Sequence, residues 1–145
     1  MKIYLDMCCY NRPYDPQDQL RVSLETQSKL LIQRRIIEGK YELVGSYTLD
    51  YECSNVPSPL RKKQIVEFIH KNAKFYVGHA GDAIVSQKAS EIMTNHIKEY
   101  DAYHVASAIY AKCDYFISVD DRLLKYQTSE IKMVTPIEFI TEMEE

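Results

Sequence analysis

The chain lacks the excess of basic residues that a general nucleic-acid-binding protein carries. Its 145 residues include 18 lysines and arginines against 21 aspartates and glutamates, which gives a net charge of −3, and its pI is near 5.8. Proteins that bind nucleic acid through general electrostatics are usually strongly basic. Any nucleic-acid contact therefore has to come from a local basic patch or from a metal that bridges to phosphate.

A cationic leader and a long apolar segment are also missing. The chain starts on a short strand-like run, KIYLDM, and no stretch is apolar for long enough to span a bilayer. A secretory leader would need a basic region followed by an apolar one. We therefore expect a cytoplasmic protein without a membrane segment.

Paired cysteines are absent too. Four cysteines occur, with no C-x-x-C pair and no zinc-type spacing: Cys8, Cys9, Cys53 and Cys113. We expect them to be reduced and buried as small hydrophobic residues. Because three of them stand beside Asp6 or Glu52, a redox or soft-metal site stays open as the alternative.

Motifs of several common enzyme classes cannot be found. The sequence has no G-x-x-x-x-G-K-[ST] or G-x-G-x-x-G segment to hold phosphates, no G-x-S-x-G nucleophile elbow and no H-E-x-x-H motif. These absences argue against nucleotide-binding enzymes of those types, elbow-type serine hydrolases and zinc proteases. His104 stands one helical turn after Asp101 and could orient it, although an ordinary hydrogen-bonded helix histidine is the alternative.

Apolar periodicity and turn residues predict alternating strands and helices along the whole chain. Strands are expected at 2–7, 41–46, 75–77, 115–118 and 131–134. Helices are expected at 17–38, 48–55, 60–71, 82–96, 101–112, 122–124 and 135–143, with a turn at 11–18. Such alternation implies one α/β domain over residues 1–145, a three-layer α/β/α fold with a mostly parallel central sheet.

Two of these helices have informative ends. The helix at 17–38 shows a loose apolar periodicity and is expected to stop at Gly39. Its apolar positions are Leu20, Leu24, Leu30, Leu31, Ile36 and Ile37. The last helix is expected to be capped by Thr135, with Pro136 in its first turn.

Four acidic residues stand where the patterns change: Asp6, Glu52, Asp101 and Asp120. In an open α/β sheet such positions converge on the crevice outside the carboxyl ends of the strands. Two unit charges about 4 Å apart repel by roughly 4 kcal/mol at an effective dielectric near 20, so a cluster needs a cation or takes up protons. With no matching cluster of Cys or His, the acids favour a hard ion such as Mg²⁺ or Mn²⁺. We therefore expect a metal-dependent hydrolase.

Each acid also has a simpler structural explanation. Asp6 could cap a helix or pair with a base, and Glu52 could be a solvated helix residue. Asp101 could be an N-cap or first-turn acid that the helix dipole stabilises. One of Asp120 and Asp121 could cap the short helix that follows, which leaves the other free for chemistry.

Taken together, the motifs resemble those of the PIN-domain nucleases. The matching segments are IYLDMCCYNRP, SYTLDYE, DAYHVASAIYA and FISVDD, in the family's order. The resemblance runs from Lys2 to about Phe139. The step of 19 residues from Asp101 to Asp120 (120 minus 101) joins the helix to the strand as that family requires.

The resemblance implies a single-domain Mg²⁺- or Mn²⁺-dependent endoribonuclease, in this family frequently the toxin of a toxin–antitoxin pair and often a homodimer. Carried across by motif, Asp6, Glu52, Asp101 and Asp120 are the catalytic and metal-binding quartet, with Ser118 as the supporting hydroxyl. RNA as substrate and an antitoxin protein are the implied partners. Two alternatives stay open: a non-catalytic PIN-like module that binds RNA or protein, and a DNA or flap-type nuclease.

Some positions depart from the family pattern. Ser118 stands where Thr is commoner. It leaves its strand two residues before Asp120, so both side chains can point the same way, and its hydroxyl could hold a carboxylate or a metal-bound water. The segment 11–18 is longer than in a minimal family member, and either Asp15 or Asp121 could supply an extra ligand. The turn AKCDYF lacks the usual glycine.

Contacts with partners can also be expected from the sequence. Arg12 and the basic run 61–63 could touch RNA phosphates, although a solvated charged face is the alternative for that run. The twelve tyrosines could stack on bases or pack at the edge of the core. An antitoxin segment could lie in a groove formed by apolar residues close to Glu52: Leu49, Leu60, Ile65 and Phe68.

Overall fold

The computed structural model describes residues 1–144. Its five strands form one sheet in the order β3-β2-β1-β4-β5, and every neighbouring pair is parallel. They are β1 (Lys2–Leu5), β2 (Glu42–Ser46), β3 (Ala73–Val77), β4 (Tyr115–Ile117) and β5 (Lys132–Val134). The central strands are continuous apolar runs, as expected when helices cover both faces of a parallel sheet.

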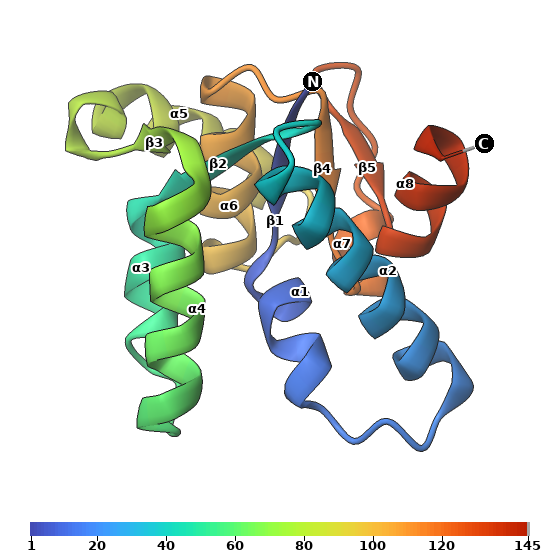
Figure 1. Ribbon diagram of the computed structural model, residues 1–145. Coiled ribbons are helices and arrows are strands. Elements are labelled where there is room, and N and C mark those ends of the chain that lie inside the picture. The colour runs from blue at the N-terminus through green and yellow to red at the C-terminus, as the bar shows by residue number, and fades with distance from the viewer. Residues whose placement is uncertain (145) are drawn as a thin grey trace.

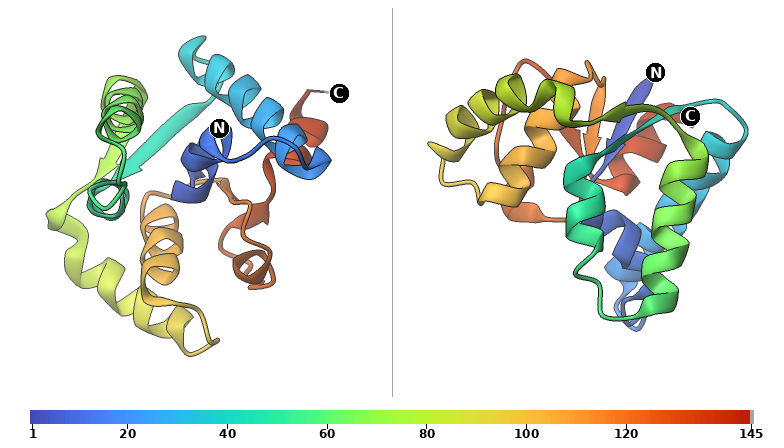
Figure 2. Two further views of the ribbon diagram at one scale, coloured as in Figure 1. Left: turned by 90° about the horizontal axis from the view of Figure 1, so that it is seen from below. Right: turned by 90° about the vertical axis from the view of Figure 1, so that its left-hand side faces the viewer.

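Helices lie on both sides of this sheet. They are α1 (Met7–Asn11), α2 (Leu20–Ile37), α3 (Tyr47–Cys53), α4 (Pro59–Asn72), α5 (Asp82–Met93), α6 (Glu99–Tyr110), α7 (Asp121–Leu124) and α8 (Pro136–Met143), with short 3-10 turns η1 (Arg12–Tyr14) and η2 (His79–Gly81). Helices α2 and α8 pack together, with α4 on the same side as α2; α5 and α6 pack together on the opposite side (Figures 1 and 2). The predicted three-layer α/β class is therefore confirmed. Within residues 1–144, no helix combines the length and apolarity needed to cross a membrane.

The order of the strands places a switch point at the centre of the sheet. From β1 the chain moves outward to β2 and β3, then returns past them to β4 and continues to β5 on the other side. The strands β1 and β4 are neighbours, with Leu5 opposite Ile117. In open α/β sheets, ligands bind at the carboxyl ends of the strands that flank such a reversal. Asp6 and Ser118 are the residues that follow these two strands.

The segment after β1 differs from its prediction. The first strand ends at Leu5 rather than residue 7, and the short helix α1 begins at Met7. Arg12–Tyr14 then form a 3-10 turn where an irregular turn was expected. A helix of five residues is too short to show apolar periodicity, and its start depends on Asp6, whose carboxylate accepts the Met7 N–H.

Helix α2 is where predicted, but of the six apolar positions that gave its periodicity only Ile36 is among its buried residues. Of the residues that gave its periodicity, Leu20 is 75% exposed and Ile37 is 62% exposed, whereas Glu25 and Lys29 are buried. Glu25 is 3.1 Å from Arg12 of η1, and the Lys29 ammonium is 5.4 Å from the centre of the Tyr10 ring. Partners from outside the helix therefore decide which side turns inward.

The two helix-end signals read from the sequence agree with the structure, although several other helix bounds differ from prediction, such as α5, which ends at Met93 rather than residue 96. Thr135 caps α8, and together with Glu138 it forms a reciprocal capping box. Gly39, two residues after α2, has a φ of +82°, a conformation that glycine adopts without strain. These local signals act within a few residues, which is why the sequence shows them directly.

Candidate active site

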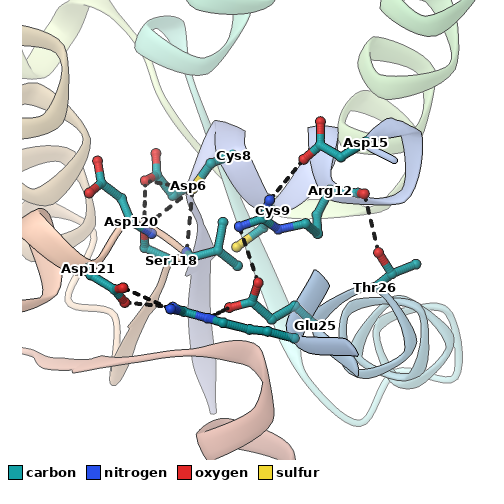
Figure 3. Close-up of polar contacts among 12 residues, drawn as sticks. Asp6, Cys8, Cys9, Arg12, Asp15, Glu25, Thr26, Ser118, Asp120 and Asp121 are labelled. Carbon is teal, nitrogen blue, oxygen red and sulfur yellow. Dashed lines mark hydrogen bonds and ion pairs between the residues drawn. The ribbon is translucent and has the colours of Figure 1, made fainter. Parts of the chain in front are cut away.

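Asp6 lies at the centre of the switch point and is fixed there by three donors. One carboxylate oxygen accepts the Met7 N–H at 2.8 Å. The other accepts the Ser118 hydroxyl at 2.8 Å and the Cys8 thiol at 3.2 Å. The side chain is only about 5% exposed, and Figure 3 shows it facing Ser118 and Asp120. A buried carboxylate held so closely has one orientation toward the crevice.

Ser118 connects Asp6 to Asp120. While its hydroxyl donates to Asp6, its oxygen accepts the Asp120 N–H at 3.1 Å. Asp120 is the N-cap of α7, because its Oδ1 accepts the N–H groups of Arg122 at 3.0 Å and Leu123 at 3.4 Å. Ser118 therefore holds the Asp6 carboxylate, one of the two contacts expected for it. Of the two adjacent acids, Asp120 is the one that caps the helix, and Asp121 pairs with Arg21.

Glu52 reaches the site from α3 and is held by a histidine. His104 Nε2 is 2.6 Å from the Glu52 carboxylate and 3.9 Å from Asp6. On its other side, His104 Nδ1 is 2.7 Å from the Tyr4 hydroxyl, which lies 2.6 Å from Ser46 Oγ. His104 is fully buried. Burial alone would lower the pKa of His104, but the hydrogen bond to Glu52 and the charges of nearby acids raise it above its ordinary value.

Asp101 completes the quartet from the first turn of α6. Burial, together with the carboxylates of Asp6 and Asp120, raises the pKa of Asp101 to about 6; the charge on His104 opposes this and Glu52 adds to it. The charges of the other three predicted acids therefore all act on Asp101. The helix cap is not Asp101, because Lys98 occupies that position without a side-chain bond.

The donor set fits a divalent cation. Carboxylate oxygens of Asp6 and Glu52 and a ring nitrogen of His104 lie within 4.8 Å of one another, and Asp101 and Asp120 border them. Within residues 1–144, no Lys or Arg forms an ion pair with any of the four acids. The cluster therefore offers carboxylate and imidazole donors that could hold a metal ion.

Other acids considered as extra ligands are engaged elsewhere. Asp121 lies 2.6 Å from Arg21, and Asp15 lies 3.0 Å from Arg12, a pair that Figure 3 shows. Arg12 also binds the buried Glu25. The expectation that Arg12 meets RNA phosphates is therefore unsupported, since its guanidinium holds two carboxylates of its own chain.

The cysteines are free thiols, as predicted. Cys8 lies 3.3 Å from Ser118 and 3.2 Å from Asp6. A hydrogen bond with Cys9, burial and the Asp6 charge raise the pKa of Cys8 well above its ordinary value. The thiolate is the reactive and soft-metal-binding form, so this environment disfavours the redox alternative.

The groove expected beside Glu52 is not formed as predicted. Leu49 is fully buried and Ile65 is 3% exposed, so both belong to the core, while Leu60 is 66% exposed. Apolar residues near one another in sequence were assigned to a surface, but α3 and α4 turn most of them toward the sheet.

Sequence reasoning missed the importance of His104 and its support by Tyr4 and Ser46. The signal was present in DAYHV, because residues three apart share a helix face. What the sequence could not show was the partner of His104. The histidine holds Glu52, which lies on another helix, and not Asp101, which lies on the same helix as His104.

A five-stranded parallel α/β fold with acids at the β1–β4 switch point has a PIN-like architecture. The fold is similar to that of a chain in the crystal structure of VapBC2 from Rickettsia felis bound to a DNA fragment from its promoter. The TM-score is 0.55 and the sequence identity 14%, over 93% of this chain and 98% of that chain. No protein-family model and no curated protein matches the sequence. At this identity the likeness establishes the fold, and the function has to be argued from the site.

Proposed function

We propose that the chain is a Mg²⁺- or Mn²⁺-dependent endoribonuclease that hydrolyses RNA phosphodiester bonds. The observation that carries this proposal is the convergence of four carboxylates on one crevice, where burial and like charge raise the pKa of Asp101 to about 6. Such a cluster is costly without a cation. The resemblance of the four motifs to PIN-domain nucleases adds the substrate class.

We assign the roles of the residues from how firmly the fold holds each side chain. Asp6, Asp101 and Asp120 would hold the ion, with Ser118 fixing Asp6 relative to Asp120. Glu52, whose side chain is 34% exposed, would complete the ion's surroundings or orient the attacking water. When bound, the ion would activate water and offset negative charge on the scissile phosphate. His104 keeps Glu52 in place in either protonation state, because Tyr4 can donate to it or accept from it.

The test compares two adjacent acids. Asp120→Asn keeps an oxygen to cap α7 but removes a carboxylate from the crevice, whereas Asp121→Asn changes an exposed residue paired with Arg21. We expect Asp120→Asn and Asp6→Asn to abolish cleavage of single-stranded RNA in Mn²⁺, while Asp121→Asn stays within a few fold of the parent. EDTA should stop cleavage by the parent.

Three results would point elsewhere. Cleavage that survives in Asp6→Asn, Asp120→Asn or excess EDTA would remove the metal mechanism. RNA binding without cleavage by the parent would favour the non-catalytic module, and cleavage of DNA in preference to RNA would favour the DNA or flap-type nuclease.

We further propose that the protein is the toxin of a toxin–antitoxin module and a homodimer. The PIN-like fold and the motif resemblance support this, as does the likeness to a chain of the VapBC2 complex. Induced expression of the parent should arrest growth and degrade RNA, and expression of Asp6→Asn should be harmless. The dimer is tested separately, by sedimentation of the purified chain. Equal, harmless expression of both proteins would remove the toxin proposal and leave a housekeeping nuclease.

A further inference from the structure

A pocket of about 380 Å³ lies beside the acidic site, between α3, α5 and α6. Four tyrosines line it, together with His79 and Ser86: Tyr47, Tyr51, Tyr100 and Tyr103. Three of these rings are substantially exposed, Tyr47 at 45%, Tyr51 at 47% and Tyr100 at 46%. The pocket tyrosines therefore differ from Tyr4 and Tyr10, which are buried in the core.

The exposed rings form a continuous aromatic wall. The Tyr51 ring centre is 6.2 Å from that of Tyr47 and 5.8 Å from that of Tyr100, with the planes tilted by 35° and 32°. His79 extends the wall, with its ring centre 4.4 Å from that of Tyr47. A flat aromatic ligand can lie against such a wall by offset stacking.

Two tyrosines of the aromatic wall are sequence neighbours of site acids. Tyr51 immediately precedes Glu52 on α3, and Tyr100 immediately precedes Asp101 on α6, so the Cα atom of each tyrosine is about 3.8 Å from the Cα atom of a site acid. A strand with its phosphate at the carboxylates would place a neighbouring base at these rings.

The charges of the pocket select against phosphate. Among the described residues that line it, the acids are Asp82 and Glu99, and neither Lys nor Arg is present; Asp82 lies 3.1 Å from His79 Nδ1, which leaves Glu99 without that partner. Carboxylates would repel a phosphate but can accept the N–H groups on a base edge. An uncharged flat group with polar edges suits this lining.

We propose that this pocket binds one unpaired base of single-stranded RNA, next to the phosphodiester that is cut. The proposal rests on the proposed function and deepens it, because it explains how an acidic protein selects its substrate: bases stack while the ion and carboxylates take the phosphate. A base paired in a duplex would not present its face to the wall, so the pocket selects single strands.

The experiment measures binding separately from cleavage. Asp120→Asn protein is titrated in Mg²⁺ with a fluorescent single-stranded hexaribonucleotide and with versions that carry one abasic residue at each position. One position should lose affinity by about 5- to 150-fold, the range for a stacked base. Adding Tyr51→Leu should weaken the natural oligonucleotide by a similar factor and abolish the abasic effect. Tyr51→Phe keeps the ring and should restore both.

A matched control is Tyr14→Leu, since Tyr14 is 43% exposed but lies outside the pocket lining. It should keep the abasic effect. An undiminished abasic effect in Tyr51→Leu, or no binding to any oligonucleotide, would overturn the proposal. So would a change from dimer to monomer in Tyr51→Leu with unaltered RNA affinity, because the pocket would then be covered by a second copy of the chain.

The outcomes also separate this proposal from the nuclease itself. If the parent protein binds RNA in a base-dependent way but never cuts it, the pocket proposal stands and the nuclease proposal fails. If the parent and Tyr51→Leu cut RNA with equal efficiency, the nuclease proposal stands and the pocket proposal fails.

Discussion

Asp101 carries a charge that the metal-free protein tolerates poorly. Its pKa is about 6 in the folded protein against an ordinary 3.8, because of burial and the nearby Asp6 and Asp120. Between pH 3.8 and 6 the unfolded chain loses this proton while the folded protein keeps it, so folding stability falls over that window as pH rises. Above pH 6 the full cost is present.

We therefore expect Asp101→Asn to stabilise the protein in EDTA at pH 7.5 by about 1 kcal/mol, less than the shift alone implies because solvent screens a half-buried carboxylate. The gain should vanish near pH 4. Urea unfolding at both pH values measures it, with Asp121→Asn as the control that gains nothing. Adding Mn²⁺ should stabilise the parent more than Asp101→Asn; a gain that is equal at pH 4 and pH 7.5 would contradict the charge explanation.

Lys29 on α2 carries a second costly charge. Burial lowers its pKa to about 8, although its ammonium donates to Gln33 at 2.8 Å and lies near the rings of Tyr10 and Phe68. The folded protein holds this proton less firmly than the unfolded chain does. Its cost is therefore full below pH 8 and fades as pH rises toward the ordinary value of 10.5.

Lys29→Met should raise the free energy of unfolding by about 2 kcal/mol at pH 7, and by clearly less at pH 9.5. Lys63→Met, at a side chain that is 71% exposed, should change it by less than about 0.5 kcal/mol. A destabilised Lys29→Met protein at pH 7 would show instead that the contacts of the ammonium outweigh its burial.

Two helix caps offer a comparison at the scale of elements. Ser46 caps α3 by accepting the Leu49 N–H at 3.1 Å, and it also contacts Tyr4 in the chain of bonds that ends at Glu52. Thr135 caps α8, which packs with α2. Both caps stabilise a helix, but only one of those helices carries a site acid.

Each of Ser46→Ala and Thr135→Ala should lower the free energy of unfolding by about 1 kcal/mol. Cleavage per folded molecule should fall only in Ser46→Ala, since its loss disturbs the support of His104 and Glu52. Kinetics at saturating RNA and urea unfolding of the same preparations separate the two effects. An equal fall in activity for both variants would mean that α8 matters to the site in a way that its position does not explain.

How well the sequence predicted each element follows from the range of the forces involved. The caps at Thr135 and Gly39 act locally, and both were read correctly. The inward face of α2 depends on Arg12 and on the rings near Lys29, which come from other segments, so the apolar periodicity identified only Ile36 of its buried residues. The short α1 gave no periodic signal at all.

At the scale of the whole molecule, the topology was the strongest prediction. Alternating patterns imply a parallel sheet, a parallel sheet implies a switch point, and acids at strand ends converge there. Asp6, Asp101 and Asp120 could be placed by that reasoning. The tie from His104 to Glu52 could not, because it joins residues 52 apart through side-chain orientation rather than through backbone direction.

The pairing of β1 with β4 also determines when the site can assemble during synthesis of the chain. β1 leaves the ribosome before β4, yet one of its neighbours begins at Tyr115, and Ser118 meets Asp6 across 112 residues. A chain that stops before Tyr115 has neither this neighbour nor Asp120, and distant pairings of this kind form slowly. If the site cuts RNA, a growing chain therefore cannot cut the message that encodes it until β4 and Asp120 have been made.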